Sequence, residues 1–192
     1  MVADCIAGKS NSLLIRKDAH FSEKRIQSLI VHEIETHVLT AANGNLQSYK
    51  IFGRGLADYL LTQEGMAMYN VEQQIGENFK ENYRALTHVL TNYLALTHSF
   101  AETYKKIIEF GIPAGTALRS TLKVKRGFTD TSEAGAFTKD LVYYQGYKQV
   151  AKFIENGGKM EELYIGKLNL KDLSTVQEIK NMREPKYLPD WL

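Results

Sequence analysis

Several residue types are scarce in this sequence, and each scarcity excludes a class of protein. The 192 residues include a single cysteine, Cys5, and 3 prolines. A lone cysteine cannot form an internal disulfide, which favours a reducing compartment. With 44% hydrophobic and 24% charged residues, the chain does not have the composition of a disordered or collagen-like protein. We therefore expect an ordered cytoplasmic protein.

An excess of one charge and long apolar runs are also missing. The chain has 24 basic and 22 acidic side chains, which give a formal net charge of +2. No segment concentrates like charges as a phosphate-binding surface does, so the sequence predicts no nucleic-acid partner. No segment approaches the ~20 apolar residues of a membrane span, and the N-terminus lacks the layout of a signal peptide. We expect no association with a membrane.

The hydrophobic residues that are present follow mainly helical spacing. Length and spacing predict one domain over residues 1–192, of the mainly α (α+β) class. A β-capable run at residues 11–17 predicts one strand, whose edge could add an extended peptide. The first helix is expected to begin after Ser22 and to end at the Ala-Asn-Gly of residues 42–44. Further helices are expected at residues 55–75, 79–110, 114–123, 137–155, 160–166 and 173–182, followed by an extended tail.

One motif in the first predicted helix carries metal-binding chemistry. Residues 32–37 read His-Glu-Ile-Glu-Thr-His. Neutral imidazoles are good zinc ligands, and a neighbouring carboxylate accepts a proton from metal-bound water in peptidases with a His-Glu-x-x-His motif. Here His32 and His37 are five positions apart instead of four. At about 100° per residue, their side chains differ by about 140° around a regular α-helix and cannot reach one ion.

The residues leave three interpretations of this motif open. A π-bulge absorbs one extra residue and returns His37 to the face of His32, and such bulges favour functional sites. Alternatively, Glu33 and His37 form the ligand pair and His32 points elsewhere. In the third interpretation, both histidines are ordinary helix residues paired with nearby glutamates.

A carboxylate in the second predicted helix supports a metal site. Glu64 lies on the apolar stripe of residues 55–75, where an ionised group needs a cation or a hydrogen-bond partner. Gly65 follows it, and a mid-helix glycine costs about 0.8–1.0 kcal/mol relative to alanine. That cost is easier to understand if another backbone or a substrate approaches there. His32, His37 and Glu64 would give three protein ligands and leave a fourth position open for water, as in catalytic zinc sites.

Two motifs together resemble those of a known family. Residues 32–37 and the Gln-Glu-Gly-Met-Ala of residues 63–67 are similar to those of the family named for a QEGLA motif and described as flavohaemoglobin-expression-modulating. Its eukaryotic relatives are the microtubule tyrosine carboxypeptidases. The resemblance extends from about Cys5 to Glu155 and includes Arg126-Gly127, residues 137–140 and Tyr143. Met66 replaces the leucine of the family name, a change that conserves volume.

This resemblance implies a helical metallopeptidase core with a small β edge near the N-terminus. By that resemblance, Zn2+ would be held by His32, His37 and Glu64, with Glu33 as the catalytic carboxylate. A similar six-residue zinc motif is known in dipeptidyl peptidase III. Family members carry a further segment before this region, so we expect a catalytic core without its upstream N-terminal part.

These features predict a zinc-dependent carboxypeptidase that hydrolyses the C-terminal bond of a peptide or protein. Glu33 would be the general base for metal-activated water. The substrate's terminal carboxylate needs a cation, for which Arg126 and Lys139 are candidates. The oxyanion needs a donor, for which Tyr143 or Tyr144 is a candidate. The alternative function is a non-catalytic or regulatory metal-binding helical domain that modulates expression.

Overall fold

The computed structural model describes residues 5–7, 13–76 and 83–192, and these residues are mainly helical. The mainly α class is thus confirmed. Two short strands, β1 (Cys5–Ala7) and β2 (Leu13–Ile15), pair antiparallel, with Ile6 opposite Leu14. The strand predicted at residues 11–17 is confirmed by β2, and its first two residues lie outside the described residues. Among the described helices, none has the length and hydropathy needed to cross a membrane.

The chain divides into two compact units. The first consists of residues 1–77 and 145–192, and the second consists of residues 78–144. The second unit is therefore an insertion in the sequence of the first. The length of the chain predicts one domain, and no change in composition marks the boundaries of these units.

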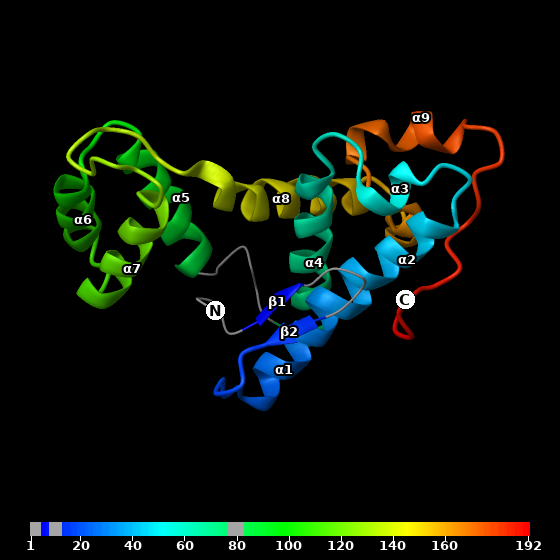
Figure 1. Ribbon diagram of the computed structural model, residues 1–192, viewed down its shortest axis with the longest axis horizontal. Helices are drawn as coiled ribbons and strands as arrows, with labels where there is room; N and C mark the ends of the chain where they lie inside the picture. Colours follow the sequence, from blue (N-terminus) through cyan, green and yellow to red (C-terminus); the bar gives the residue numbers. More distant parts are fainter. Residues whose placement is uncertain (1–4, 8–12, 77–82) are drawn as a thin grey trace. The chain divides into compact units, whose positions relative to one another are not determined.

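One continuous helical rod in the first unit carries the histidine motif (Figure 1). It consists of α1 (Glu23–Leu29), the π-helix η1 (Ile30–Val38) and α2 (Leu39–Leu46). The Ser22 hydroxyl accepts a hydrogen bond from the backbone N–H of Arg25 at 3.2 Å, which confirms the predicted cap. The rod runs past the predicted stop at Gly44. A Cβ at Gly44 would collide with the carbonyl oxygen of Phe52, so this glycine allows α3 (Ile51–Arg54) to pack closely.

The helix that carries Glu64 is shorter than predicted. α4 (Tyr59–Ile75) begins four residues after the expected start, because Gly55 and Asp58 have φ angles of 122° and 55° that a helix does not allow. Its buried face includes several polar residues that the apolar stripe did not predict. The buried residues are Thr62, Gln63, Gly65, Met66, Ala67, Asn70 and Val71. α4 packs against η1.

α4 crosses α8 (Leu141–Glu155) at a pair of glycines. A Cβ on Gly65 would collide with the backbone of Gly146, and a Cβ on Gly146 would collide with the carbonyl oxygen of Leu61. The close backbone approach expected at Gly65 is therefore confirmed. The helix predicted at residues 137–155 starts as a short 3-10 turn, η2 (Thr138–Asp140), before α8.

The C-terminal part of the chain completes the core of the first unit. Its elements are the 3-10 helices η3 (Met160–Ile165) and η4 (Leu170–Asp172) and the short helix α9 (Leu173–Gln177). The helices predicted at residues 160–166 and 173–182 are thus tighter or shorter than expected. The buried core contains Phe52, Met66, Val150, Met160, Leu163, Tyr164, Ile165, Leu168, Leu173 and Val176. Residues 183–192 contain no helix, which agrees with the predicted extended tail.

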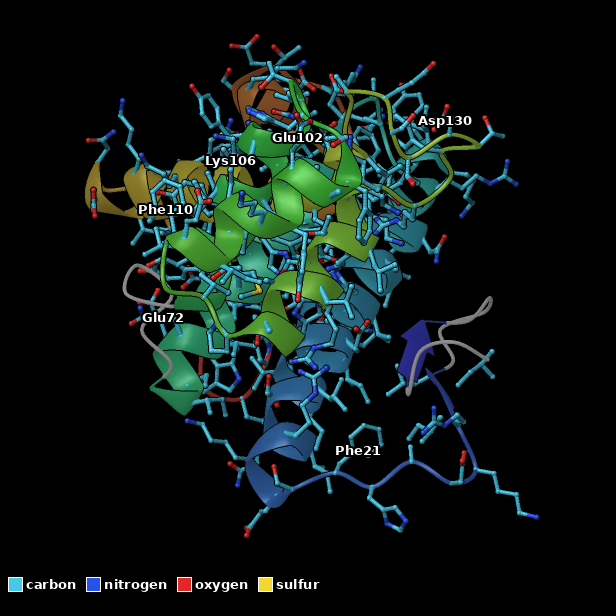
Figure 2. The ribbon with its side chains drawn as sticks, turned by 90° about the vertical axis from the view of Figure 1, so that its left-hand side faces the viewer. Phe21, Glu72, Glu102, Lys106, Phe110 and Asp130 are labelled. Carbon is cyan, nitrogen blue, oxygen red and sulfur yellow. The ribbon has the colours of Figure 1, made fainter. Side chains whose placement is uncertain are left out.

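The second unit contains α5 (Tyr83–Ala95), α6 (Phe100–Glu109) and α7 (Ala114–Val124). The single helix predicted at residues 79–110 is wrong, because Ser99 and Glu102 form a capping box that starts a new helix. Residues 79–82 lie outside the described residues. Figure 2 shows Glu102, Lys106 and Phe110 along α6. The small core of this unit contains Leu94, Ile107, Ile112 and Ala117.

Candidate active site

The π-helix η1 brings the two histidines of the motif together. It extends over 9 residues, so the wide winding is longer than a single bulge. The ring centroids of His32 and His37 lie 5.0 Å apart, with the ring planes at 84°. The interpretation that a wide turn returns the sixth residue of the motif to the face of the first is therefore confirmed.

Glu64 on α4 lies against both imidazoles. Its Oε2 atom is 3.4 Å from His32 Nε2 and 3.7 Å from His37 Nε2. This oxygen is buried and makes no hydrogen bond within the described part of the chain. The packing of α4 on η1 thus places a carboxylate oxygen between two ring nitrogens.

A second carboxylate, that of Glu33, lies on the same rod as the histidines. Glu33 Oε1 is 3.9 Å from His32 Nε2. One ligand-type atom from each of His32, Glu33 and His37 lies within 4.8 Å of the others. His32 does not point elsewhere, as the alternative ligand pair of Glu33 and His37 required. Two imidazoles and two carboxylates therefore converge on one place.

The carboxylates and imidazoles of this cluster shift one another's pKa values. Burial by itself would raise the pKa of the Glu64 carboxyl, but its contacts with His32 and His37 outweigh burial and lower that pKa to about 2. Burial also disfavours a charged His37, yet Glu64 and Glu33 raise the pKa of this imidazole. The Glu64 carboxylate is therefore ionised at neutral pH and presents negative charge to any cation in the site.

The donor set fits a divalent metal ion. Zinc in proteins is bound by imidazole nitrogen and carboxylate oxygen, and a buried carboxylate oxygen with no hydrogen-bond donor is costly unless a cation meets it. His32, His37 and Glu64 provide two such nitrogens and one such oxygen. The residues present thus fit a zinc ion, and the assignment of His32, His37 and Glu64 as its ligands stays a prediction.

Gln63 orients one of the histidines. His37 Nδ1 lies 3.3 Å from Gln63 Oε1, and since an amide oxygen only accepts, the ring nitrogen is the donor. This hydrogen bond leaves Nε2 of the neutral ring free for a metal. The sequence analysis included Gln63 in the motif of residues 63–67 but predicted no role for it. The argument made for Glu64, a polar residue in a stretch that faces the interior, would have found it.

Glu35, also in the motif, contacts the C-terminal tail. Its Oε2 atom accepts a hydrogen bond of 2.7 Å from the indole Nε1 of Trp191. The tail therefore reaches the same rod that carries the histidines.

The predicted substrate-binding residues lie in the second unit, whereas the histidines lie in the first. Arg126 donates to both carboxylate oxygens of Asp140 at 3.4 and 3.3 Å, and its guanidinium stacks 4.0 Å from the ring centroid of Phe137. Lys139 is exposed and Tyr143 is half-buried. The roles of Arg126, Lys139 and Tyr143 stay predictions.

Comparison with known proteins identifies the family of the chain. The family profile described as microtubule-associated tyrosine carboxypeptidase matches residues 1–192. The chain belongs to this family. Membership in the microtubule-associated tyrosine carboxypeptidases confirms the resemblance seen in the two motifs and supports a carboxypeptidase-like function.

Curated relatives of this tyrosine carboxypeptidase family are longer than the chain. The candidate tyrosine carboxypeptidase MATCAP2 of Mus musculus is 31% identical over 175 residues, which cover 88% of this chain and 33% of the relative. Its Homo sapiens counterpart is 30% identical over 176 residues, with the same coverage. Microtubule-associated tyrosine carboxypeptidase 1 of Mus musculus is 26% identical over 172 residues, 86% of this chain and 36% of the relative. The chain thus spans about a third of the length of these relatives.

Proposed function

We propose that the chain is a zinc-dependent carboxypeptidase in which His32, His37 and Glu64 hold the metal and Glu33 is the general base. The observation that carries this proposal is the buried Glu64 Oε2 atom, which has no hydrogen bond within the described residues and lies between two imidazole Nε2 atoms. Two histidines and one glutamate are an established ligand set of catalytic zinc. Family membership supports the peptidase class independently.

The two carboxylates have different surroundings, and these favour different roles. The Glu64 side chain is 13% exposed and lies against both imidazoles, whereas the Glu33 side chain is 20% exposed and pairs with His32 at 3.9 Å. A bound zinc ion would lower the pKa of its water and polarise the scissile carbonyl. Glu33 would accept the proton of the attacking water on a carboxylate oxygen and deliver it to the leaving amine. Gln63 would keep the Nδ1 proton on His37 throughout.

The names of the relatives suggest the class of substrate. They are described as tyrosine carboxypeptidases, and some as microtubule-associated. We propose a peptide or protein C-terminus as the substrate in a cytoplasmic setting, with a C-terminal tyrosine as the first residue to test. Arg126 and Lys139 remain candidates for binding the terminal carboxylate, and Tyr143 remains a candidate donor to the oxyanion.

The first test measures zinc content and hydrolysis of a tyrosine-ended peptide in two variants. Glu33→Gln should lower hydrolysis by about 10²–10⁴-fold, because it removes the base, and should leave the zinc content unchanged. Glu64→Gln should lower both, because it removes a ligand. Elemental analysis of the purified protein and release of free tyrosine provide the two measurements.

Glu35→Gln is the matched control, because Glu35 lies in the same motif but contacts Trp191. This variant should keep both zinc and activity. The same peptide with an amidated C-terminus should resist cleavage if the enzyme needs a free carboxylate. Wild-type protein that holds zinc but hydrolyses no peptide would contradict the enzyme and favour a non-catalytic metal-binding domain. Protein without zinc would contradict the metal site itself.

A further inference from the structure

In the described helices, buried threonines can bond through their hydroxyls to the carbonyl four residues back. This is the normal pattern for threonine in an α-helix. Three of them do so at 2.7, 2.6 and 2.8 Å, namely Thr40, Thr91 and Thr121.

Thr36 differs from these residues. Its hydroxyl donates to the carbonyl oxygen of Val31, five residues back, at 2.8 Å. Val31 directly precedes His32, and Thr36 directly precedes His37. The hydrogen bond therefore spans the same five-residue step that separates the two histidines, and it closes the wide turn on which the candidate site depends.

Two residues from other elements hold the Thr36 hydroxyl in place. The side-chain amide of Asn70 on α4 donates to Thr36 Oγ1 at 2.9 Å and to the Tyr164 hydroxyl oxygen at 3.0 Å. Because Thr36 gives its only hydroxyl hydrogen to Val31, its oxygen accepts from Asn70. Thr36 and Tyr164 are 0% exposed and Asn70 is 1% exposed. The network is therefore buried away from water. In the low-dielectric interior of a protein, hydrogen bonds are stronger and their loss is more costly.

We infer that Thr36, Asn70 and Tyr164 form a positioning cluster that fixes the π-winding of η1 and so sets the metal-binding geometry of His32 and His37. The inference rests on the proposed function, because it concerns the site where zinc would bind. π-Helices are rare and need support from their surroundings. Without the cluster, η1 would relax toward α-winding, in which the two imidazoles diverge by about 140°. The hydrogen bonds described above join these three residues to one another and to the Val31 carbonyl, so the cluster acts through the backbone.

Thr36→Val tests the inference, because it removes the hydroxyl and keeps the branched shape. Zinc affinity, measured by competition with a chelator, should fall by about 10–100-fold, as for other residues that support metal ligands. The visible spectrum of the cobalt-substituted protein should also change, since it reports the arrangement of the ligands. Thr36→Ser keeps the hydroxyl and should restore both.

Thr121→Val is the matched control, since it removes an equally buried hydroxyl that bonds four residues back in α7. It should lower stability without changing zinc affinity or the cobalt spectrum. If Thr36→Val behaves in the same way while the wild-type protein binds zinc, the inference fails and the proposed function stands. Wild-type protein that binds no zinc overturns both. Should Thr36→Val not fold, Tyr164→Phe replaces it, and an unchanged affinity and spectrum in that variant would overturn the inference.

Discussion

Asp140 is a buried carboxylate with two cationic partners. Lys123 Nζ lies 3.0 Å from its Oδ2 atom, and Arg126 Nη2 lies 3.3 Å from its Oδ1 atom. Burial disfavours the charge of Asp140, but the two cations outweigh burial and lower the pKa of its carboxyl. A carboxyl whose pKa is lower in the folded state stabilises that state above its unfolded pKa of about 3.9. This contribution is lost as the pH falls through the folded-state pKa.

Asp140→Asn should therefore lower the free energy of unfolding at pH 7 by about 1–2 kcal/mol, since it leaves two cations without their partner. The value is modest because the side chains of Lys123 and Arg126 are 42% and 39% exposed, and water screens them. Urea unfolding between pH 7 and pH 3 would measure the difference between wild type and variant. The difference should shrink below about pH 4, and a constant difference would contradict the assignment.

At the scale of elements, the spacing of His32 and His37 gave the wide turn as one of three interpretations, because a regular helix cannot bring residues five apart to one ion. The break between α5 and α6 was missed, since hydrophobic spacing stays nearly helical across it and only Ser99 and Glu102 mark a new start. The strand, the first cap and the position of Glu64 followed from local pattern. These features depend on residues close in sequence.

The supporting parts of the candidate site could not be read from local pattern. Gln63 and Asn70 are polar residues on the buried face of α4, and they bond to partners on η1 and η3. Such partners are distant in sequence, so a hydrophobic stripe cannot reveal them. The carboxylates and imidazoles were predicted because their chemistry is specific, whereas amides and hydroxyls occur on many surfaces.

The crossing of α4 and α8 leads to a prediction at this scale. Gly65→Ala should destabilise the protein by about 1–3 kcal/mol through overpacking, although alanine is the better helix former. It should also weaken zinc binding, because Glu64 adjoins the displaced backbone. Thermal unfolding and chelator competition are the measurements.

Gly115→Ala in α7 is the control for that crossing. A Cβ there has Arg119 Nη1 at 3.6 Å as its nearest neighbour, an ordinary contact. This variant should be neutral or more stable by up to about 1 kcal/mol. A Gly65→Ala protein that is as stable as Gly115→Ala would show that the two helices can separate freely.

At the scale of the whole molecule, the C-terminal tail is fastened to α2 through its backbone. Asn43 accepts from the N–H groups of Lys186 and Tyr187 at 3.0 and 2.8 Å and donates to the Tyr187 carbonyl at 2.8 Å. Gln47 accepts from the N–H of Arg183 at 2.9 Å and donates to its carbonyl at 2.9 Å. The side-chain amides of Asn43 and Gln47 bond to backbone groups of the tail, which residues of almost any type can provide. The amino-acid sequence of the tail therefore gave little indication of where the tail lies.

Asn43→Ala should release this tail. It removes three hydrogen bonds, each worth about 0.5–1.5 kcal/mol, so opening of residues 183–192 should become at least about tenfold more frequent. Amide hydrogen exchange of the tail would measure this. Ser48→Ala is the control, because its hydroxyl makes one exposed bond of 3.3 Å to Asn181 and should change exchange little. Equal exchange in Asn43→Ala and wild type would contradict the prediction.

The insertion of residues 78–144 within the sequence of the first unit also determines the order of events during synthesis. A ribosome delivers both histidines and Glu64 before the inserted unit, but Tyr164 emerges only after the whole of it. At about 5–20 residues per second, the delay between Asn70 and Tyr164 is on the order of 5–20 s. For that interval the nascent chain holds the proposed metal ligands without the Tyr164 hydroxyl of the proposed positioning cluster. We therefore expect ion uptake at the proposed site to follow the synthesis of Tyr164.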